Sequence, residues 1–145
     1  TMGYGVPSAL GVALGRPDAE VWAVVGDGGV QMTMFEFGTI VQEGAKVNIA
    51  IVNNGYLGMV RQWQELFHNR NYSETPISSP DYMLIAQAYG IPARRVTRRE
   101  EVDDAIRWAR SIDGPTLLEF KVNQEENVYP MIPSGGSIRE MIEEA

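Results

Sequence analysis

The sequence predicts an α/β fold, with a doubly wound, mostly parallel sheet and helices on both of its faces. Short β-branched runs alternate along the chain with helical segments, and this alternation is typical of crossovers between parallel strands. The run at residues 47–52 is nearly all apolar, as strands covered on both faces tend to be. The 145 residues, 44% of them hydrophobic and 21% charged, have the size and composition of one globular domain.

The first half of the chain should contain two strands and a helix. The first strand is expected at residues 20–25, which are rich in valine and end in a glycine-rich turn. A capping box from Thr33 to Glu36 then predicts the start of a helix. That helix should end at Gly44, because glycine is the usual residue after a C-cap. The second strand follows at residues 47–52.

Two more helices are expected in the middle of the chain. Residues 57–67 have large apolar side chains at helical spacing, which are those of Met59, Val60, Trp63 and Phe67. The sequence Ser79-Pro80-Asp81 predicts an N-cap, a proline at the first helical position and an acidic first turn. Gly90 should close the second of these helices.

The last elements are a helix, a strand and a tail. A capping box from Thr97 to Glu100 opens a helix with an apolar stripe at residues 102–109, and residues 116–122 form a strong strand. The C-terminal tail, residues 129–145, should be irregular before a short helix over residues 138–144. Because the chain opens on a glycine-rich stretch without a polar lead-in, we expect residues 1–145 to be one domain of a longer protein.

Composition excludes several classes of function. The formal charge of −7 and the absence of a Lys/Arg run argue against binding to nucleic acid or to an anionic membrane. Without cysteine there is no disulfide framework, thiolate zinc site, iron–sulfur cluster or cysteine nucleophile. No apolar stretch approaches the length of a membrane span, and no leader is visible. A soluble, cytoplasmic domain is therefore expected.

A polar motif follows the carboxyl end of each of the first two predicted strands. Gly26-Asp27-Gly28-Gly29 follows the first strand and Asn53-Asn54 follows the second. Ligands of open parallel sheets bind beyond the carboxyl ends of the strands, so Asp27 and Asn54 can lie side by side. A carboxylate and an amide oxygen suit Mg²⁺, which completes its coordination with water and substrate phosphates. Either motif alone is ordinary turn chemistry, but the pair predicts a magnesium–diphosphate site.

Two further features support binding of a diphosphate. Gly28 and Gly29 leave room for a phosphate to approach the backbone. The backbone amides that open the helix at Leu57 offer a second site for an anion.

This pair of motifs resembles the cofactor-binding motif of thiamine diphosphate (ThDP, or thiamine pyrophosphate) enzymes. Residues 1–9, Thr-Met-Gly-Tyr-Gly-Val-Pro-Ser-Ala, resemble the stretch upstream of that motif in the 2-oxoacid branch of the superfamily. Residues 54–64, Asn-Gly-Tyr-Leu-Gly-Met-Val-Arg-Gln-Trp-Gln, resemble the catalytic subunits of acetolactate (acetohydroxyacid) synthases. The tail, with Tyr-Pro-Met-Ile-Pro at residues 129–133 and Glu-Met-Ile at residues 140–142, resembles the same subunits. The resemblance covers essentially the whole chain.

The resemblance implies a role for each site residue. Asp27, Asn54 and the backbone carbonyl of Tyr56 would bind Mg²⁺. Met2 would lie under the cofactor and force its bent shape, while the glycines and the start of the 57–67 helix would cradle the diphosphate. The complete cofactor-binding set is Met2, Gly3, Gly26, Asp27, Gly28, Gly29, Asn54, Tyr56, Leu57, Gly58 and Met59. Met32, just after the metal motif, is a further candidate to face the cofactor.

Three side chains would line the substrate channel, those of Met59, Val60 and Trp63. Trp63 matches a family residue that favours 2-oxobutyrate over a second pyruvate as acceptor. By its helical spacing alone, a tryptophan at this position is more often a core residue, and only the resemblance favours the channel. The only histidine, His68, is interpreted as a solvated residue at a helix end. The arginines at 94–95 and 98–99 are interpreted as a solvated basic cluster.

The implied activity is decarboxylation of pyruvate and its ligation to a second 2-oxoacid, pyruvate or 2-oxobutyrate, in the branched-chain pathway to isoleucine and valine. No catalytic residue is expected in this chain, because the activating glutamate of the family is on a missing domain of the neighbouring subunit. The chain alone should therefore be inactive. A structural FAD would be bound mainly by another missing domain. Homodimers or homotetramers and a regulatory small subunit are the implied partners.

Two alternatives remain open at this stage. The chain could belong to another ThDP enzyme, such as a pyruvate oxidase, a 2-oxoacid decarboxylase or a glyoxylate carboligase. It could also be a non-catalytic binding or interaction module with the same fold.

Overall fold

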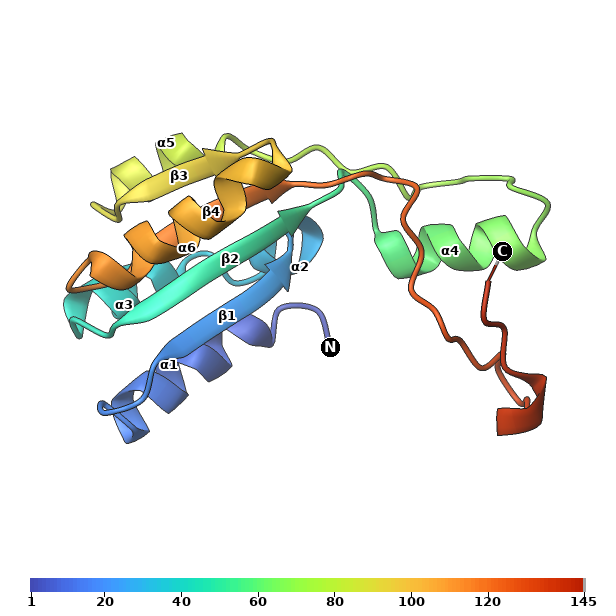
Figure 1. Ribbon diagram of the computed structural model, residues 1–145, viewed down its shortest axis with the longest axis horizontal. Coiled ribbons are helices and arrows are strands. Elements are labelled where there is room, and N and C mark those ends of the chain that lie inside the picture. The colour runs from blue at the N-terminus through green and yellow to red at the C-terminus, as the bar shows by residue number, and fades with distance from the viewer. Residues whose placement is uncertain (145) are drawn as a thin grey trace.

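Four parallel strands form the sheet of the computed structural model, which describes residues 1–144. In spatial order they are β1 (Val21–Gly26), β2 (Val47–Asn53), β4 (Thr116–Lys121) and β3 (Ala93–Val96). All carboxyl ends therefore point to one edge of the sheet, the right-hand edge in Figure 1. The predicted parallel sheet is confirmed.

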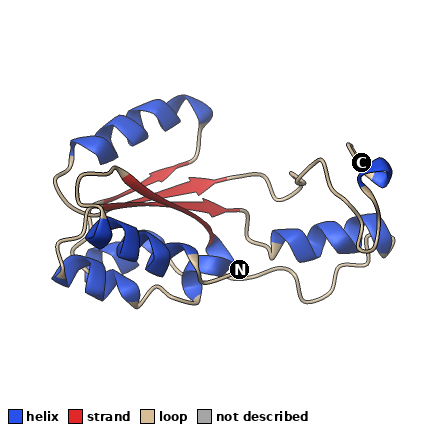
Figure 2. Ribbon diagram, turned by 90° about the horizontal axis from the view of Figure 1, so that it is seen from below, coloured by secondary structure: helices blue, strands red, loops and turns tan. Residues whose placement is uncertain are grey.

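Helices cover both faces of this sheet, as predicted (Figure 2). The more heavily covered face carries α1 (Gly5–Gly15), α2 (Asp27–Gln31), α3 (Glu36–Gln42) and α5 (Tyr82–Ala88). The other face carries α6 (Val102–Ser111), which follows the short 3₁₀ turn η1 (Arg99–Glu101). No helix among residues 1–144 is long and apolar enough to cross a membrane.

The core lies mainly on the more heavily covered face. Phe37, Ile49 and Leu117 are completely buried there between the strands and the helices. On the opposite face α6 covers β3 and β4, where Leu118 is buried. That face of β1 lacks a covering helix within residues 1–144, and Val24 is 69% exposed.

Two expected helix ends are confirmed and three expected helix starts are wrong in detail. Gly44 and Gly90 follow α3 and α5 with φ of 61° and 72°, the left-handed conformation that glycine adopts without steric cost. Thr33 does not cap α3, because Phe35 already has helical dihedral angles and the Thr33 hydroxyl has no hydrogen-bond partner. A side-chain cap requires an extended residue before the helix.

The other two corrections are shifts of one or two residues. Asp81, not Ser79, is the N-cap of α5, because its extended backbone lets the carboxylate accept a hydrogen bond from Met83 N at 3.0 Å. Before α6, the amides of Thr97 and Arg98 donate to Glu101 Oε2. The prediction of Glu100 as the partner in this capping box is therefore wrong, because the side chain of Glu101 accepts these hydrogen bonds.

Three elements, α1, α2 and β3, were not predicted. The glycine-rich turn expected after the first strand is the start of α2, which begins at Asp27. α1 begins inside the glycine-rich opening of the chain. β3 contains two consecutive arginines whose side chains are exposed, as the interpretation of a solvated cluster expects. Arg95 also forms an ion pair with the buried Glu119 at 2.6 Å. Arg94 lies over the Trp108 ring, 4.3 Å from its centroid.

α4 (Gly58–Phe67) and the tail lie together beyond the carboxyl edge of the sheet (Figure 1). Gln62 of α4 is buried, and its amide exchanges hydrogen bonds of 2.9 and 2.8 Å with the Val128 backbone. The tail helix is shorter than predicted, a single 3₁₀ turn η2 (Ile138–Glu140). It ends early because the next residues are extended, and Ile142 pairs with Met131 in an antiparallel bridge.

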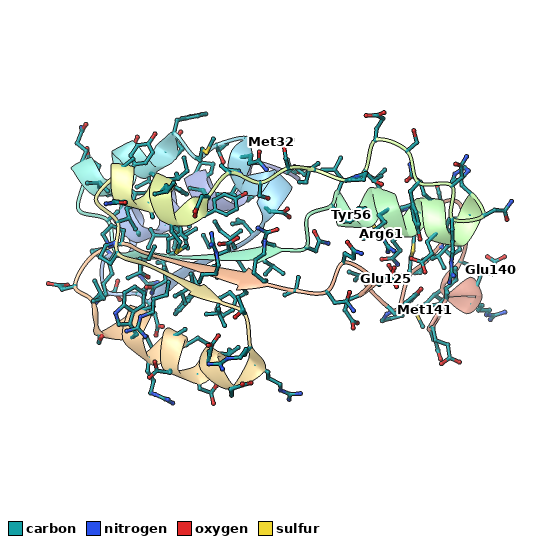
Figure 3. All side chains as sticks on the ribbon, turned by 90° about the horizontal axis from the view of Figure 1, so that it is seen from above. Met32, Tyr56, Arg61, Glu125, Glu140 and Met141 are labelled. Carbon is teal, nitrogen blue, oxygen red and sulfur yellow. The ribbon has the colours of Figure 1, made fainter. Side chains whose placement is uncertain are left out.

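The buried side of α4 is its polar side. Arg61 is nearly inaccessible between Glu65 at 3.0 Å, Glu125 at 3.3 Å and the Tyr72 ring (Figure 3). The apolar stripe that predicted this helix points elsewhere, since Met59 is 50% exposed and the other members of the stripe are also largely or partly exposed. The apolar stripe of α4 is therefore available to the cavity at the sheet edge and to other molecules.

Candidate functional site

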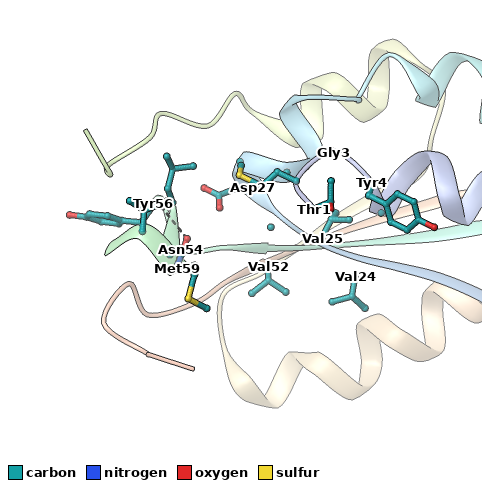
Figure 4. Close-up of a pocket in the computed structure, with 18 residues that line it drawn as sticks. Thr1, Gly3, Tyr4, Val24, Val25, Asp27, Val52, Asn54, Tyr56 and Met59 are labelled. Atoms are coloured by element: carbon teal, nitrogen blue, oxygen red, sulfur yellow. Dashed lines mark hydrogen bonds between the residues drawn. The ribbon is translucent and has the colours of Figure 1, made fainter. Parts of the chain in front are cut away.

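A cavity of about 560 Å³ opens at the carboxyl edge of the sheet. Its walls come from the first residues of the chain, the ends of β1 and β2, α2 and the start of α4 (Figure 4). All eleven residues of the predicted cofactor-binding set line it. Val60, predicted for the substrate channel, lines it as well. The topology therefore assembles one site from segments that are up to 59 positions apart, from Thr1 to Val60.

Asp27 is the one acidic residue among those that line the cavity, and it is only 1% exposed. Its Oδ2 accepts hydrogen bonds from Gly55 N and from Ser79 Oγ, both at 3.1 Å. The Tyr82 hydroxyl donates to the Asp27 carbonyl at 2.9 Å. Among residues 1–144, no donor hydrogen-bonds the second carboxylate oxygen, Oδ1. The carboxylate is thus held by one oxygen while the other is free for a ligand.

Tyr82 is a neutral donor in this arrangement. Its side chain is completely buried, and burial raises the pKa of its phenol. Its hydroxyl proton therefore stays in place at neutral pH and fixes the backbone at Asp27.

Asn54 and Tyr56, which follow β2, also line the cavity. Asn54 Oδ1 accepts a hydrogen bond from Tyr56 N at 3.1 Å, which forms a tight turn at the end of β2. The Tyr56 ring points away from Asp27 (Figure 4) and lies 5.5 Å from the Arg61 guanidinium carbon. The Tyr56 ring is therefore directed away from the carboxylate.

This donor set fits a magnesium ion. Mg²⁺ takes one or two protein carboxylates and fills its other positions with neutral oxygens, water and substrate phosphates. Within residues 1–144, no cluster of three or more His, Cys, Asp or Glu side chains could hold a metal. One carboxylate with amide and carbonyl oxygens leaves positions for phosphate oxygens, as a metal–diphosphate complex requires.

The glycines of the site have different tasks. A Cβ on Gly26 would meet nothing within 4 Å, so this position keeps the cavity open. A Cβ on Gly28 would lie 3.1 Å from the Met2 methyl and 3.2 Å from Leu57 Cδ2, so glycine lets these side chains close over the turn. Gly3 has φ of +78°, which L side chains rarely adopt.

The start of α4 has free backbone amides that could bind an anion. No side chain caps this helix, and the first intrahelical bond is donated by Arg61 N to Leu57 O. The amides of Gly58, Met59 and Val60 precede that bond, and these residues line the cavity. Unpaired N–H groups and the positive end of the helix dipole favour bound phosphate.

Two predicted residues lie outside this cavity. Trp63 is half-buried, stacks on Phe67 with 4.9 Å between the ring centroids, and lines a separate shallow depression that it shares with Val60. Met32 does not line the cavity but packs beside Gly3, where a Cβ would lie 3.2 Å from Met32 Cβ. His68 is the exposed C-cap of α4, as predicted.

The sequence did not predict the residues that hold Asp27 and the turn after β2 in place through hydrogen bonds. Ser79 and Tyr82 come from the α5 region, more than 50 positions away. Asn53 and Glu119 are buried and hydrogen-bonded to each other at 2.7 Å. A glutamate inside the apolar run of β4 was the one available sequence signal.

Comparisons with known proteins agree with this geometry. The family described as thiamine pyrophosphate enzyme, C-terminal TPP binding domain, matches residues 1–120. The acetolactate synthase large subunit of Corynebacterium glutamicum is 48% identical over an alignment of 143 residues, and the match covers 94% of this chain and 23% of that protein. The large subunit of acetolactate synthase isozyme 2 from Escherichia coli K12 is 40% identical over 144 residues, 99% of this chain and 26% of that protein.

A solved structure is also similar. The thiamine diphosphate-dependent 4-hydroxybenzoylformate decarboxylase of Rhodococcus jostii RHA1 superimposes with a TM-score of 0.78 at 29% identity. The match covers 84% of this chain and 23% of that one. The chain thus spans about a quarter of the length of the relatives that it matches.

Proposed function

The chain belongs to the thiamine pyrophosphate (ThDP) enzymes through their C-terminal ThDP-binding domain, and we propose that it provides the Mg²⁺–ThDP site of an acetolactate synthase catalytic subunit. One observation carries the proposal. A single cavity combines the buried Asp27, the Asn54 turn and the uncapped start of α4. This combination suits a magnesium-bound diphosphate better than it suits any other common ligand.

Each residue has a defined task in this proposal. Asp27, Asn54 and the Tyr56 carbonyl hold the metal, and the amides at the start of α4 hold the diphosphate. Met2 supports the cofactor from below, next to Gly28. When bound, ThDP supplies a nucleophilic carbon that adds to the carbonyl group of a 2-oxoacid. The chain's own residues bind and orient this group, and Val24 and Val52 add apolar surface to the cavity wall.

The proton transfers require residues from elsewhere. Among residues 1–144, Asp27 is the only carboxylate that lines the cavity, and its charge is needed by the metal. We therefore assign the activating glutamate to another domain, supplied by a neighbouring subunit of a homodimer or homotetramer. In the complete three-domain subunit, whose last domain would be residues 1–145, FAD would be bound mainly outside this chain. A cytoplasmic location and a regulatory small subunit complete the proposal.

Acetolactate synthesis is favoured over other ThDP chemistry. The acetolactate synthase subunits are 40 and 48% identical over nearly the whole chain, against 29% for the decarboxylase. The substrates would be pyruvate as donor, and pyruvate or 2-oxobutyrate as acceptor. A binding module without chemistry would have no need for an open α4 start beside a metal-ligating carboxylate.

Titration calorimetry of the complete protein with ThDP tests the binding step. We expect saturable binding with Mg²⁺ and loss of binding with a chelator. Formation of acetolactate from pyruvate, detected by product analysis, then tests the activity. Binding without acetolactate would exclude the synthase and keep the ThDP site, whereas no binding would exclude both.

Trp63→Leu should change acceptor choice. The indole would give the extra methylene of 2-oxobutyrate an apolar surface that pyruvate uses less. One buried methylene is worth about 0.8 kcal/mol by transfer, and shaped pockets discriminate by about 1–3 kcal/mol. Competition between the two acceptors should show a preference for 2-oxobutyrate lowered about tenfold.

Phe67→Leu is the matched control for this prediction. Phe67 stacks on Trp63 from the next turn of α4, so its loss should lower the melting temperature without changing the product ratio. If Trp63→Leu behaves like Phe67→Leu, Trp63 packs the helix and does not select the acceptor.

A further inference from the structure

A chain of polar contacts connects β3 to the metal-ligating carboxylate, and its central residues, Glu119 and Asn53, are buried. It begins at Arg95, whose Nε donates to Glu119 Oε2 at 2.6 Å. Glu119 Oε1 accepts from Asn53 Nδ2 at 2.7 Å, and Asn53 Oδ1 accepts from Gly55 N at 3.1 Å. The same Gly55 N–H is shared with Asp27 Oδ2, also at 3.1 Å.

Glu119 determines which way the Asn53 amide faces. A primary amide has a donor end and an acceptor end. Because Glu119 takes the donor end, the amide oxygen must face the turn, where it receives the Gly55 N–H. Both side chains are at most 2% exposed, so water does not replace either contact. The turn that presents Asn54 and contacts Asp27 is thereby fixed from inside the fold.

A buried carboxylate at position 119 costs free energy of folding. Burial of a charge requires compensation, and an apolar residue of similar size often gives an equally stable protein. The neighbouring residues of β4, Leu117 and Leu118, are apolar and buried. Arg95 compensates the charge directly, and Lys121 lies 3.5 Å from Oε1. Packing alone therefore does not explain a glutamate at the functional end of the strand.

We propose that Glu119 is a positioning residue of the metal site, which acts through Asn53 and Gly55 to orient Asp27 and Asn54 for the cation. The inference rests on the proposed Mg²⁺–ThDP function. Without Glu119 the Asn53 amide can rotate, and the Gly55 N–H loses its fixed direction. Groups that orient metal ligands in this way typically change metal affinity by about 10- to 100-fold.

Thr116→Val is a control on the same two strands. Thr116 Oγ1 donates to Asn48 Oδ1 at 2.7 Å, and both residues are buried. This pair joins β4 to β2 as Glu119 and Asn53 do, but toward the amino end of the strands, where residue 48 pairs with residue 116. Its loss should reduce stability without touching the site.

The test measures the affinity of the complete protein, with ThDP present, for Mn²⁺. Mn²⁺ substitutes for Mg²⁺ because its binding can be followed by electron paramagnetic resonance. Glu119→Gln keeps the size of the side chain but offers one acceptor to two donors, Asn53 and Arg95. We expect it to weaken Mn²⁺ binding about tenfold. Asn53→Ala should weaken binding at least as much, and the double variant no more than the stronger single variant. Thr116→Val should lower the melting temperature and leave Mn²⁺ affinity unchanged.

Two outcomes would overturn the inference and leave the proposed function intact. The first is a Glu119→Gln protein whose Mn²⁺ affinity stays within about twofold of wild type while its melting temperature falls, well below the effect expected of an orienting group. The second is additivity of the Glu119 and Asn53 effects, which would mean that the two residues act independently. If the wild-type protein shows no ThDP-dependent Mn²⁺ binding, the proposed function itself fails.

Discussion

Asp27→Ala should abolish Mg²⁺-dependent retention of ThDP in the complete protein. Within the described part of the chain, Asp27 is the only carboxylate on the cavity wall, and residues that merely orient metal ligands already change affinity by about 10- to 100-fold. We therefore expect Mg²⁺ affinity to fall by more than about 100-fold, the upper end of that range. Asn54→Ala should have a smaller effect, because a neutral amide contributes less to binding a divalent ion. Titration of Mg²⁺ at fixed ThDP measures both.

Two controls make the Asp27 result specific. Ser79→Ala removes one hydrogen bond to Asp27 Oδ2 but keeps the carboxylate, so it should weaken Mg²⁺ binding only a few-fold, about the value of one hydrogen bond. Asp18→Ala removes a negative charge from a surface ion pair with Arg16 and should have no effect. Normal activity of Asp27→Ala at stoichiometric ThDP would show that another group holds the metal.

The parallel sheet and the central site could be predicted because both follow from local patterns. β1, β2 and β4 are apolar runs with clear ends, and parallel topology brings their carboxyl ends to one edge. That rule alone was enough to predict that Asp27 and Asn54 lie at the same edge of the sheet. β3 was missed because two of its four residues are arginines. Their charges are satisfied by distant parts of the fold, Glu119 and Asp81 for Arg95 and Asp104 of α6 for Arg94.

The environment of α4 could not be predicted for a similar reason. Its helical period was correct, but its buried side is set by the tail, which has no periodicity of its own. Gln62 binds the Val128 backbone, and Arg61 pairs with Glu125 across 64 positions. Ser79 was misassigned as a cap because only the fold brings its hydroxyl to Asp27. Polar contacts between distant segments leave no periodic signal.

Gly26→Val should separate the requirements of folding from those of the cofactor. Gly26 ends β1 with an extended backbone, φ −76° and ψ 158°, which valine adopts readily. A Cβ there would meet nothing within 4 Å. The free protein should therefore be as stable as wild type, or more stable by up to about 1 kcal/mol, since the unfolded chain loses freedom.

Cofactor binding should respond in the opposite direction, because the valine side chain would occupy the open space of the cavity and hold the diphosphate away from the backbone amides. Loss of two hydrogen bonds to a charged group costs roughly 3–6 kcal/mol, which corresponds to a rise of about 100-fold or more in the ThDP dissociation constant. Gly26→Ala should give a smaller rise. Gly11→Ala, at an exposed position of α1 with equally open space, should increase stability and leave ThDP binding unchanged. A Gly26→Val protein that binds ThDP like wild type would place the diphosphate elsewhere, whereas a lower melting temperature would show that this glycine serves the fold.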